Sequence, residues 1–261
     1  MPSTIDLHVE HYGAGSPTIV LMHGFGGSAR NFRAQARELK ARYHVILFDA
    51  RGHARSAAPS DPAEYEPNCF VEDTLRVLDE RAVGPCIVGG LSMGAGIALR
   101  FAIAHPEVVR ALVLCAFPPS GDRSPSSWAL RFANAIEARG LEESGSEFVW
   151  GGDRFDNDAA RFIRQGFLEH RPHALVAILR NVIAAQPDVA DLRDELDRIA
   201  IPTLVIAGKR DRASLEPSRE LARRIRGAEF FEVPDAGHVV NLEKPKAFND
   251  ILGGFLGGFE A

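Results

Sequence analysis

The sequence predicts an α/β fold: a doubly wound, mostly parallel sheet with one inserted helical cap. Short apolar runs rich in Val, Ile and Leu lie at 18–24, 44–50, 85–90, 108–117, 201–208 and 228–234. They are continuous rather than alternating, which is the pattern of strands that are covered on both faces. Helical patterns separate most of these runs, as in βαβ units. The alternation stops between residues 118 and 187, which indicates the insertion.

Helix signals follow three of the predicted strands. Ser28 can cap a helix that reaches Leu39, and a second apolar stretch runs over residues 93–104 and stops before Pro106. A third helix is expected over Pro217–Ile225, because proline is tolerated in a first helical turn. These helices fill the crossovers that parallel strands require.

The stretch 118–187 contains helix candidates and no good strand. Its first helix is expected to open at Ser124-Pro125, to carry Trp128 and to close at Gly140. We therefore divide the chain into an α/β core, 1–117 and 188–261, and a helical cap, 118–187. The cap is expected over the carboxyl edge of the sheet, where open α/β sheets bind their ligands.

The composition excludes several classes of protein. The 261 residues include 30 Lys and Arg against 35 Asp and Glu, a net charge of −5, which argues against a nucleic-acid partner. No apolar run is long enough to span a bilayer, and the first residues lack the pattern of a signal peptide. We therefore expect a cytoplasmic protein with reduced thiols at Cys69, Cys86 and Cys115. No pattern indicates an oligomeric state.

The sequence also lacks the usual patterns of metal and cofactor sites. His and Cys are scattered without HxxxH or CxxC spacing. No GxGxxG follows the first strand, and the glycine-rich run 24–28 lacks the lysine of a phosphate-binding loop. The sequence therefore predicts no cofactor and no metal, and a small molecule as the substrate.

A serine between two glycines is the strongest local signal. In GGLSMG, Ser92 lies two residues from Gly90 and from Gly94, between a buried strand and a helix. A Gly-x-Ser-x-Gly at such a junction is typical of a sharp turn that exposes a nucleophilic serine in a strained conformation. The helix that follows directs its first amides to the same place. The alternative is a structural glycine turn with an inactive serine.

A serine nucleophile needs a base and an orienting acid. Asp211 follows the predicted strand 201–208, and His238 follows the strand 228–234, so both are expected at the edge of the sheet where the serine lies. Asp235 is an alternative acid, but it lies on the same short loop as the histidine. The loop after the strand 108–117 offers no carboxylate before Asp122.

Five motifs together resemble those of the α/β-hydrolase superfamily. They are HGFGG at 23–27, FDARGHARS at 48–56, GLSMG at 90–94, GKRD at 208–211 and DAGH at 235–238. Their order of serine, acid and histidine is the order of that superfamily. The chain looks most similar to the branch of oxoadipate enol-lactonases and small carboxylesterases, which implies the α/β-hydrolase fold.

The resemblance also implies an oxyanion hole formed by the backbone N–H groups of Phe25 and Met93. His23 and His53 are expected to be structural. Ala54 departs from the RGHG of the similar families, and we expect this to change the geometry of its loop only slightly. Aromatic residues of the cap suggest an apolar pocket roof or contacts that hold the cap on the core, and they are Trp128, Phe132, Phe148, Trp150, Phe162 and Phe167. Four cap arginines suggest a carboxylate site or a solvated face, and they are Arg161, Arg164, Arg171 and Arg180.

These observations predict a serine hydrolase that cleaves a small ester or lactone through an acyl-enzyme on Ser92. In this interpretation His238 is the general base and Asp211 orients it. A carbon–carbon bond hydrolase of aromatic breakdown with the same triad is the near alternative. A non-catalytic ligand receptor on the same fold is an alternative of another class.

Overall fold

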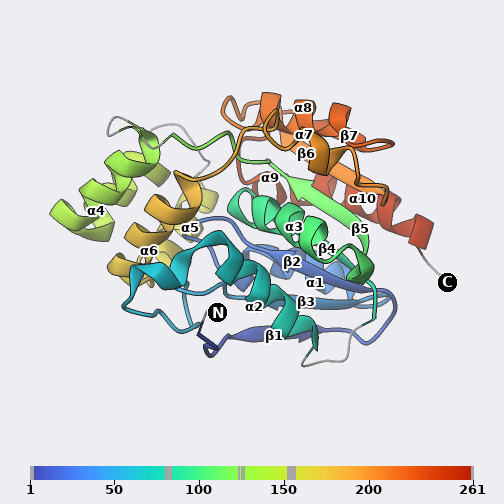
Figure 1. Ribbon diagram of the computed structural model, residues 1–261, viewed down its shortest axis with the longest axis horizontal. Coiled ribbons are helices and arrows are strands. Elements are labelled where there is room, and N and C mark those ends of the chain that lie inside the picture. Colours follow the sequence, from blue (N-terminus) through green and yellow to red (C-terminus); the bar gives the residue numbers. More distant parts are fainter. Residues whose placement is uncertain (1–2, 80–83, 123, 125–126, 152–156, 260–261) are drawn as a thin grey trace.

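One mostly parallel sheet organises the protein. The computed structural model describes residues 3–79, 84–122, 124, 127–151 and 157–259. Within these residues the strands form a sheet in the order β1-β3-β2-β4-β5-β6-β7 (Figure 1). The strands are β1 (Val9–Tyr12), β2 (Thr18–Met22), β3 (His44–Phe48), β4 (Cys86–Leu91), β5 (Val109–Cys115), β6 (Thr203–Gly208) and β7 (Glu229–Val233).

Each of the six predicted apolar runs contains a strand, and all six strands pair in parallel. The exception is the edge strand β1, which the sequence did not predict and which runs antiparallel to β3, with Val9 opposite Phe48. Its sequence VEHY is short and polar and lacks the apolar run that identifies a strand covered on both faces. The α/β class is confirmed, with this one antiparallel edge.

Helices cover both faces of the sheet. The first face carries α1 (Arg33–Leu39), α9 (Val240–Glu243) and α10 (Pro245–Leu256), and the second carries α2 (Pro67–Asp79), α3 (Met93–Ala104) and α8 (Leu215–Arg224). Shorter helical segments are η1 (Ala29–Phe32), η2 (Pro62–Tyr65), η3 (Pro106–Val108), α7 (Arg193–Leu196) and η6 (Gly257–Phe259).

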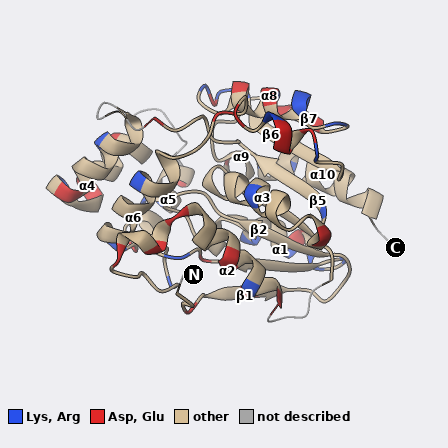
Figure 2. Cartoon of the chain, in the orientation of Figure 1, with Lys and Arg blue, Asp and Glu red and all other residues tan. Residues whose placement is uncertain are grey.

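The two faces have separate apolar cores because side chains alternate along a strand. On β2, Ile19 and Leu21 join the first core, whereas Val20 and Met22 join the second. Figure 2 shows the charged residues on the helices and loops around the sheet, while β2 carries none. Among the described residues, no helix is both long enough and apolar enough to span a bilayer.

The starts of two helices differ slightly from the prediction. The helix expected after Ser28 begins as the 3-10 turn η1 and continues as α1. The helix expected from Pro217 begins two residues earlier, as α8 at Leu215, so that the proline lies in its first turn.

The inserted segment forms a helical layer beside the sheet (Figure 1). Its elements are α4 (Trp128–Gly145), the π-helical turn η4 (Ser146–Trp150), α5 (Asn157–Phe167), α6 (Pro172–Ile178) and the π-helical turn η5 (Leu179–Ile183). The helix expected to open at Ser124-Pro125 begins later, at Trp128, and Pro125 itself lies outside the described residues. Its predicted end at Gly140 is wrong in part. Gly140 has φ 78° and ψ −178°, which interrupts the helix, but the chain then re-enters helical geometry and continues to Gly145.

Candidate active site

One large cavity lies between the helical layer and the carboxyl ends of the strands. It measures about 1090 Å³, slightly above the usual range for small-molecule sites. Its lower wall comes from the loops after β2, β4, β6 and β7, and its upper wall comes from α4, η4, α5 and η5. Ser92, Asp211 and His238 all line it. The sequence therefore brings its three predicted catalytic residues to a single cavity.

Ser92 occupies the sharp turn between β4 and α3. Its backbone has φ 55° and ψ −115°, a positive φ that non-glycine residues rarely adopt. The amide of Ser92 donates to the carbonyl oxygen of Cys115 at 2.8 Å, which ties the turn to the neighbouring strand β5. Such strain persists only where the surrounding structure fixes it, and it is typical of functional turns.

The two flanking glycines leave room for this turn. A Cβ atom on Gly90 would lie 2.4 Å from the carbonyl carbon of Gly94. A Cβ on Gly94 would lie 2.3 Å from the carbonyl oxygen of Met22 and 2.7 Å from that of His23. No side chain fits at these distances, so β4, α3 and the end of β2 approach each other this closely only with glycine at both positions.

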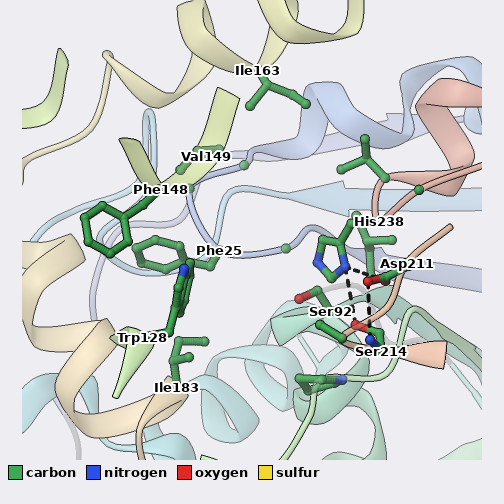
Figure 3. A pocket seen from close by; sticks show the side chains of 18 of the residues that line it. Phe25, Ser92, Trp128, Phe148, Val149, Ile163, Ile183, Asp211, Ser214 and His238 are labelled. Carbon is green, nitrogen blue, oxygen red and sulfur yellow. Dashed lines mark hydrogen bonds and ion pairs between the residues drawn. The ribbon is translucent and has the colours of Figure 1, made fainter. Parts of the chain in front are cut away.

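His238 and Asp211 form a hydrogen-bonded pair on two adjacent loops. Because β6 and β7 are neighbours, the loops that follow them meet, and Nδ1 of His238 lies 2.7 Å from Oδ2 of Asp211 (Figure 3). An ionised carboxylate only accepts, so Nδ1 carries the proton and Nε2 is left as an acceptor. Figure 3 shows Ser92 at the same end of the cavity.

The carboxyl group of Asp211 is kept ionised by its partners. Asp211 is buried, and burial alone would raise its pKa, but the hydrogen bond and the charge of His238 and the hydrogen bonds from Ser214 together hold the pKa below its ordinary value. The backbone N–H of Ser214 donates to Oδ1 of Asp211 at 3.3 Å. The acid is thus a charged acceptor for the imidazole at neutral pH.

Ser214 is a site residue that the sequence analysis missed. Its side chain is fully buried, and its Oγ lies 3.4 Å from Nδ1 of His238 (Figure 3). Ser214 is the N-cap residue of α8, yet its hydroxyl makes no capping hydrogen bond and faces the histidine–aspartate pair instead. The available signal was its position, three residues after Asp211 at a helix start.

The alternative acids lie elsewhere. Asp235 is exposed, with φ 55° in the turn before His238, and its carbonyl oxygen accepts from Arg210 at 2.7 Å. Asp122 lines the cavity, but its carboxylate accepts the backbone N–H and the hydroxyl of Ser124, each at 2.7 Å. The structure therefore pairs His238 with Asp211.

Glu243 holds the backbone of the loop that carries His238. Its side chain is almost fully buried, and its carboxylate accepts the backbone N–H of Gly237 at 2.9 Å and that of Val239 at 3.3 Å. Because these two residues flank His238, the carboxylate of Glu243 fixes the backbone on both sides of the imidazole.

The two predicted oxyanion donors come from different elements. Phe25 follows β2 and lines the cavity together with Gly24. Met93 is the first residue of α3, so its N–H is one of the helix amides that have no intrahelical acceptor. That these two amides together form an oxyanion hole stays a prediction.

Buried histidines support the loop that carries Phe25. His23 accepts from the amide of Ala50 at 2.9 Å and donates to the carbonyl oxygen of Gly24 at 2.8 Å. Burial lowers the pKa of His23 to about 4, so its imidazole is neutral. His53 accepts from the amide of Gly26 at 3.2 Å. These contacts agree with structural roles for both histidines.

Ala54, where similar families have glycine in RGHG, adopts a backbone conformation that favours glycine. Ala54 has φ 42°, in the left-handed region that favours glycine. The loop nevertheless keeps its contacts, since Asp49 accepts from the amide and the guanidinium of Arg55 at 3.2 and 2.9 Å.

His170 connects the cap to the loop that carries Phe25. Its Nε2 lies 3.0 Å from the carbonyl oxygen of Gly27, and its Nδ1 lies 3.0 Å from that of Phe167. No motif around this buried histidine predicts a role for it. Its contact joins segments that lie 143 residues apart, and no local pattern reports such a contact.

The predicted aromatic residues of the cap divide into two groups. Trp128, Phe148 and Phe162 line the cavity, whereas Phe132, Trp150 and Phe167 do not and pack in the cap's own apolar cluster, to which Phe148 also belongs. None of the four cap arginines lines the cavity, and each lies beside a carboxylate of the cap or stays in the solvated surface. Within the described residues, no cluster of three His, Cys, Asp or Glu side chains is arranged to hold a metal ion.

Comparison with known proteins now identifies the family. The model of the alpha/beta hydrolase family matches residues 19–251. The chain belongs to the alpha/beta hydrolase family. It is 30% identical over 247 residues to 3-oxoadipate enol-lactonase 1 of Acinetobacter baylyi, covering 92% of this chain and 89% of that protein.

Solved structures agree with this placement. The enol-lactonase from Burkholderia xenovorans superposes with a TM-score of 0.86 at 27% identity, covering 97% of both chains. An esterase from Thermogutta terrifontis superposes with a TM-score of 0.87 at 27% identity, covering 98% of this chain and 95% of that one. The protein is therefore a hydrolase of this family, in its enol-lactonase branch.

Proposed function

We propose that the protein is a serine hydrolase that cleaves a small ester or lactone through an acyl-enzyme on Ser92. The observation that carries the proposal is the joint placement of a strained Ser92 and the hydrogen-bonded pair of His238 and Asp211 in one cavity. A structural glycine turn does not require a strained serine with an acid–base pair beside it.

The mechanism follows from the roles of these side chains. The Ser92 oxygen attacks the carbonyl carbon while Nε2 of His238 takes the serine proton. The carbonyl oxygen becomes an oxyanion, which the amides of Phe25 and Met93 stabilise. The tetrahedral intermediate collapses, and His238 gives its proton to the leaving alkoxide. Water then attacks the acyl-enzyme with His238 as the base, which releases the acid and restores the serine.

The substrate class rests on the relatives and on the chemistry of the site. The names of two similar proteins are those of enol-lactonases, and a third is an esterase. Esters and lactones share the carbonyl that such a site attacks. We also propose that the protein acts in the cytoplasm, which its three buried, unbridged cysteines support.

Two matched aspartate variants test the triad. We expect Asp211→Asn to lower kcat for p-nitrophenyl acetate about 10⁴-fold, because the amide favours the wrong imidazole tautomer. Asp235→Asn removes an exposed carboxylate of the histidine loop and should keep kcat within about tenfold of the parent. Melting temperatures of both variants show whether either loss reflects unfolding.

The outcomes separate the alternatives. If Asp235→Asn is folded and inactive while Asp211→Asn stays active, the acid is Asp235 and the proposed triad is wrong. Saturable ligand binding by the parent protein without turnover of any ester, lactone or dienone would favour a receptor. Turnover of dienones alone would favour a carbon–carbon bond hydrolase.

A further inference from the structure

Large apolar side chains are exposed at only a few places in the described part of the chain. They are Trp128, Phe162 and Phe231, with 47%, 40% and 39% of their surfaces exposed. Trp128 and Phe162 both line the cavity that contains Ser92, whereas Phe231 lies on the edge strand β7 outside it. Exposed apolar surface that gathers in one place typically marks a binding site.

Other apolar side chains extend this surface into a wall. Phe25 comes from the loop after β2, Phe148 and Val149 come from η4, and Ile183 comes from η5. In Figure 3 the rings of Phe25, Trp128 and Phe148 lie together on one side of the cavity, and Ser92 and His238 lie on the other. The cavity thus has an apolar aromatic side that faces its polar side.

Two rings of the aromatic wall, those of Trp128 and Phe148, are held by packing within the cap. Phe148 stacks on the buried ring of Phe132, with centroids 4.7 Å apart and planes inclined by 3°. Trp128 meets Phe132 edge to face at 5.4 Å and Phe148 at 6.3 Å. Trp128 also begins α4, whose N-cap Ser127 accepts from the amide of Leu130 at 3.3 Å. A preformed surface loses little conformational freedom on binding.

The backbone of the cap gives an independent indication of a binding site. The turns η4 and η5 are both π-helical, a rare geometry that is often found at functional sites. Phe148 and Val149 reach the cavity from η4, and Ile183 reaches it from η5. Both irregular turns of the cap therefore supply side chains to this wall.

From these observations we infer that the wall of Phe25, Trp128 and Phe148 is a binding subsite for an aromatic ring of the substrate. Aromatic rings favour edge-to-face and offset contacts with such walls, which a flexible alkyl chain does not make. The substrate class is then an ester or lactone that carries an aromatic ring near its reacting carbonyl. This inference rests on the proposed function of Ser92.

Three esters with one leaving group test the subsite: methyl phenylacetate, methyl cyclohexylacetate and methyl acetate. We expect the parent protein to show kcat/KM about tenfold higher for the phenyl ester than for methyl acetate, with the cyclohexyl ester between them. Trp128→Leu should lower this preference about tenfold. Phe231→Leu removes an equally exposed ring outside the cavity and should leave the preference unchanged.

A binding measurement keeps this test separate from the catalytic proposal. The sequence has two tryptophans, Trp128 and Trp150, so Trp150→Phe makes Trp128 the only one. In the double variant with Ser92→Ala, methyl phenylacetate should change the fluorescence of Trp128 saturably, and methyl acetate should not.

The two measurements have distinct outcomes. Saturable binding of the phenyl ester without turnover in the parent protein would support the subsite and contradict the proposed function. Absence of a saturable fluorescence change, equal kcat/KM values for the phenyl and cyclohexyl esters, or an equal effect of Phe231→Leu would overturn the subsite.

Discussion

Gly94→Ala tests whether the serine turn depends on the close approach of α3 to β2. The added Cβ would lie 2.3 Å from the carbonyl oxygen of Met22 and 2.7 Å from that of His23, both backbone atoms that cannot rotate away. Helix α3 would have to move away from the sheet. We expect the free energy of unfolding to fall by about 3 kcal/mol or more, the upper range for overpacked cores.

Gly254→Ala is the matched control. Gly254 also lies within a helix, α10, but a Cβ there meets no atom within 4 Å. The same substitution should therefore raise the free energy of unfolding by about 0.5–1 kcal/mol, since alanine favours a helix. Urea unfolding of both variants measures the two values. Equal effects of the two substitutions, or a loss below about 1 kcal/mol for Gly94→Ala, would refute the steric reasoning.

Two further predictions concern Ser214 in the site and the buried His23. Ser214→Ala should lower kcat/KM about tenfold and move the acidic limb of the kcat/KM pH profile to higher pH. The reason is that the Asp211 carboxylate loses the Ser214 hydroxyl as a hydrogen-bond donor and then stabilises the protonated His238 more strongly. Ser218→Ala removes an equally buried hydroxyl of α8 that accepts from Phe117, and it should leave that limb in place. The lowered pKa of His23 contributes stability above pH 6.5 that is lost as the pH falls toward about 4. Between pH 7 and pH 5 the free energy of unfolding should fall by about 2 kcal/mol from this group, and His23→Gln should remove this part of the pH dependence. If urea unfolding of His23→Gln shows the same change of the free energy of unfolding with pH as the parent protein, the prediction is contradicted.

The sheet could be predicted because buried parallel strands differ from other segments in composition. Six continuous apolar runs each contain a strand, and the loops that follow three of them carry Ser92, Asp211 and His238. Parallel strands end at the same edge, so the position of each residue after its strand was enough to predict that the three would meet. The geometry of the turn at Ser92 followed from the glycines on either side.

Other features depend on contacts that no local pattern contains. The edge strand β1 pairs on one side only and has no long apolar run. Ser214 looks like an ordinary helix cap, and only the fold shows that its hydroxyl faces His238. The role of His170 depends on a carbonyl oxygen that lies 143 residues away. The cap aromatics come from several helical elements, and packing alone decides which of them reach the cavity.

Covalent labelling tests the central claim most directly. A fluorophosphonate reacts with an activated serine, and intact-mass spectrometry counts the adducts while peptide mapping locates them. We predict one adduct per chain, on Ser92, and none on Ser92→Ala or, over the same time, on His238→Ala. An adduct on another residue, or an unlabelled protein that still hydrolyses esters, would contradict Ser92 as the nucleophile.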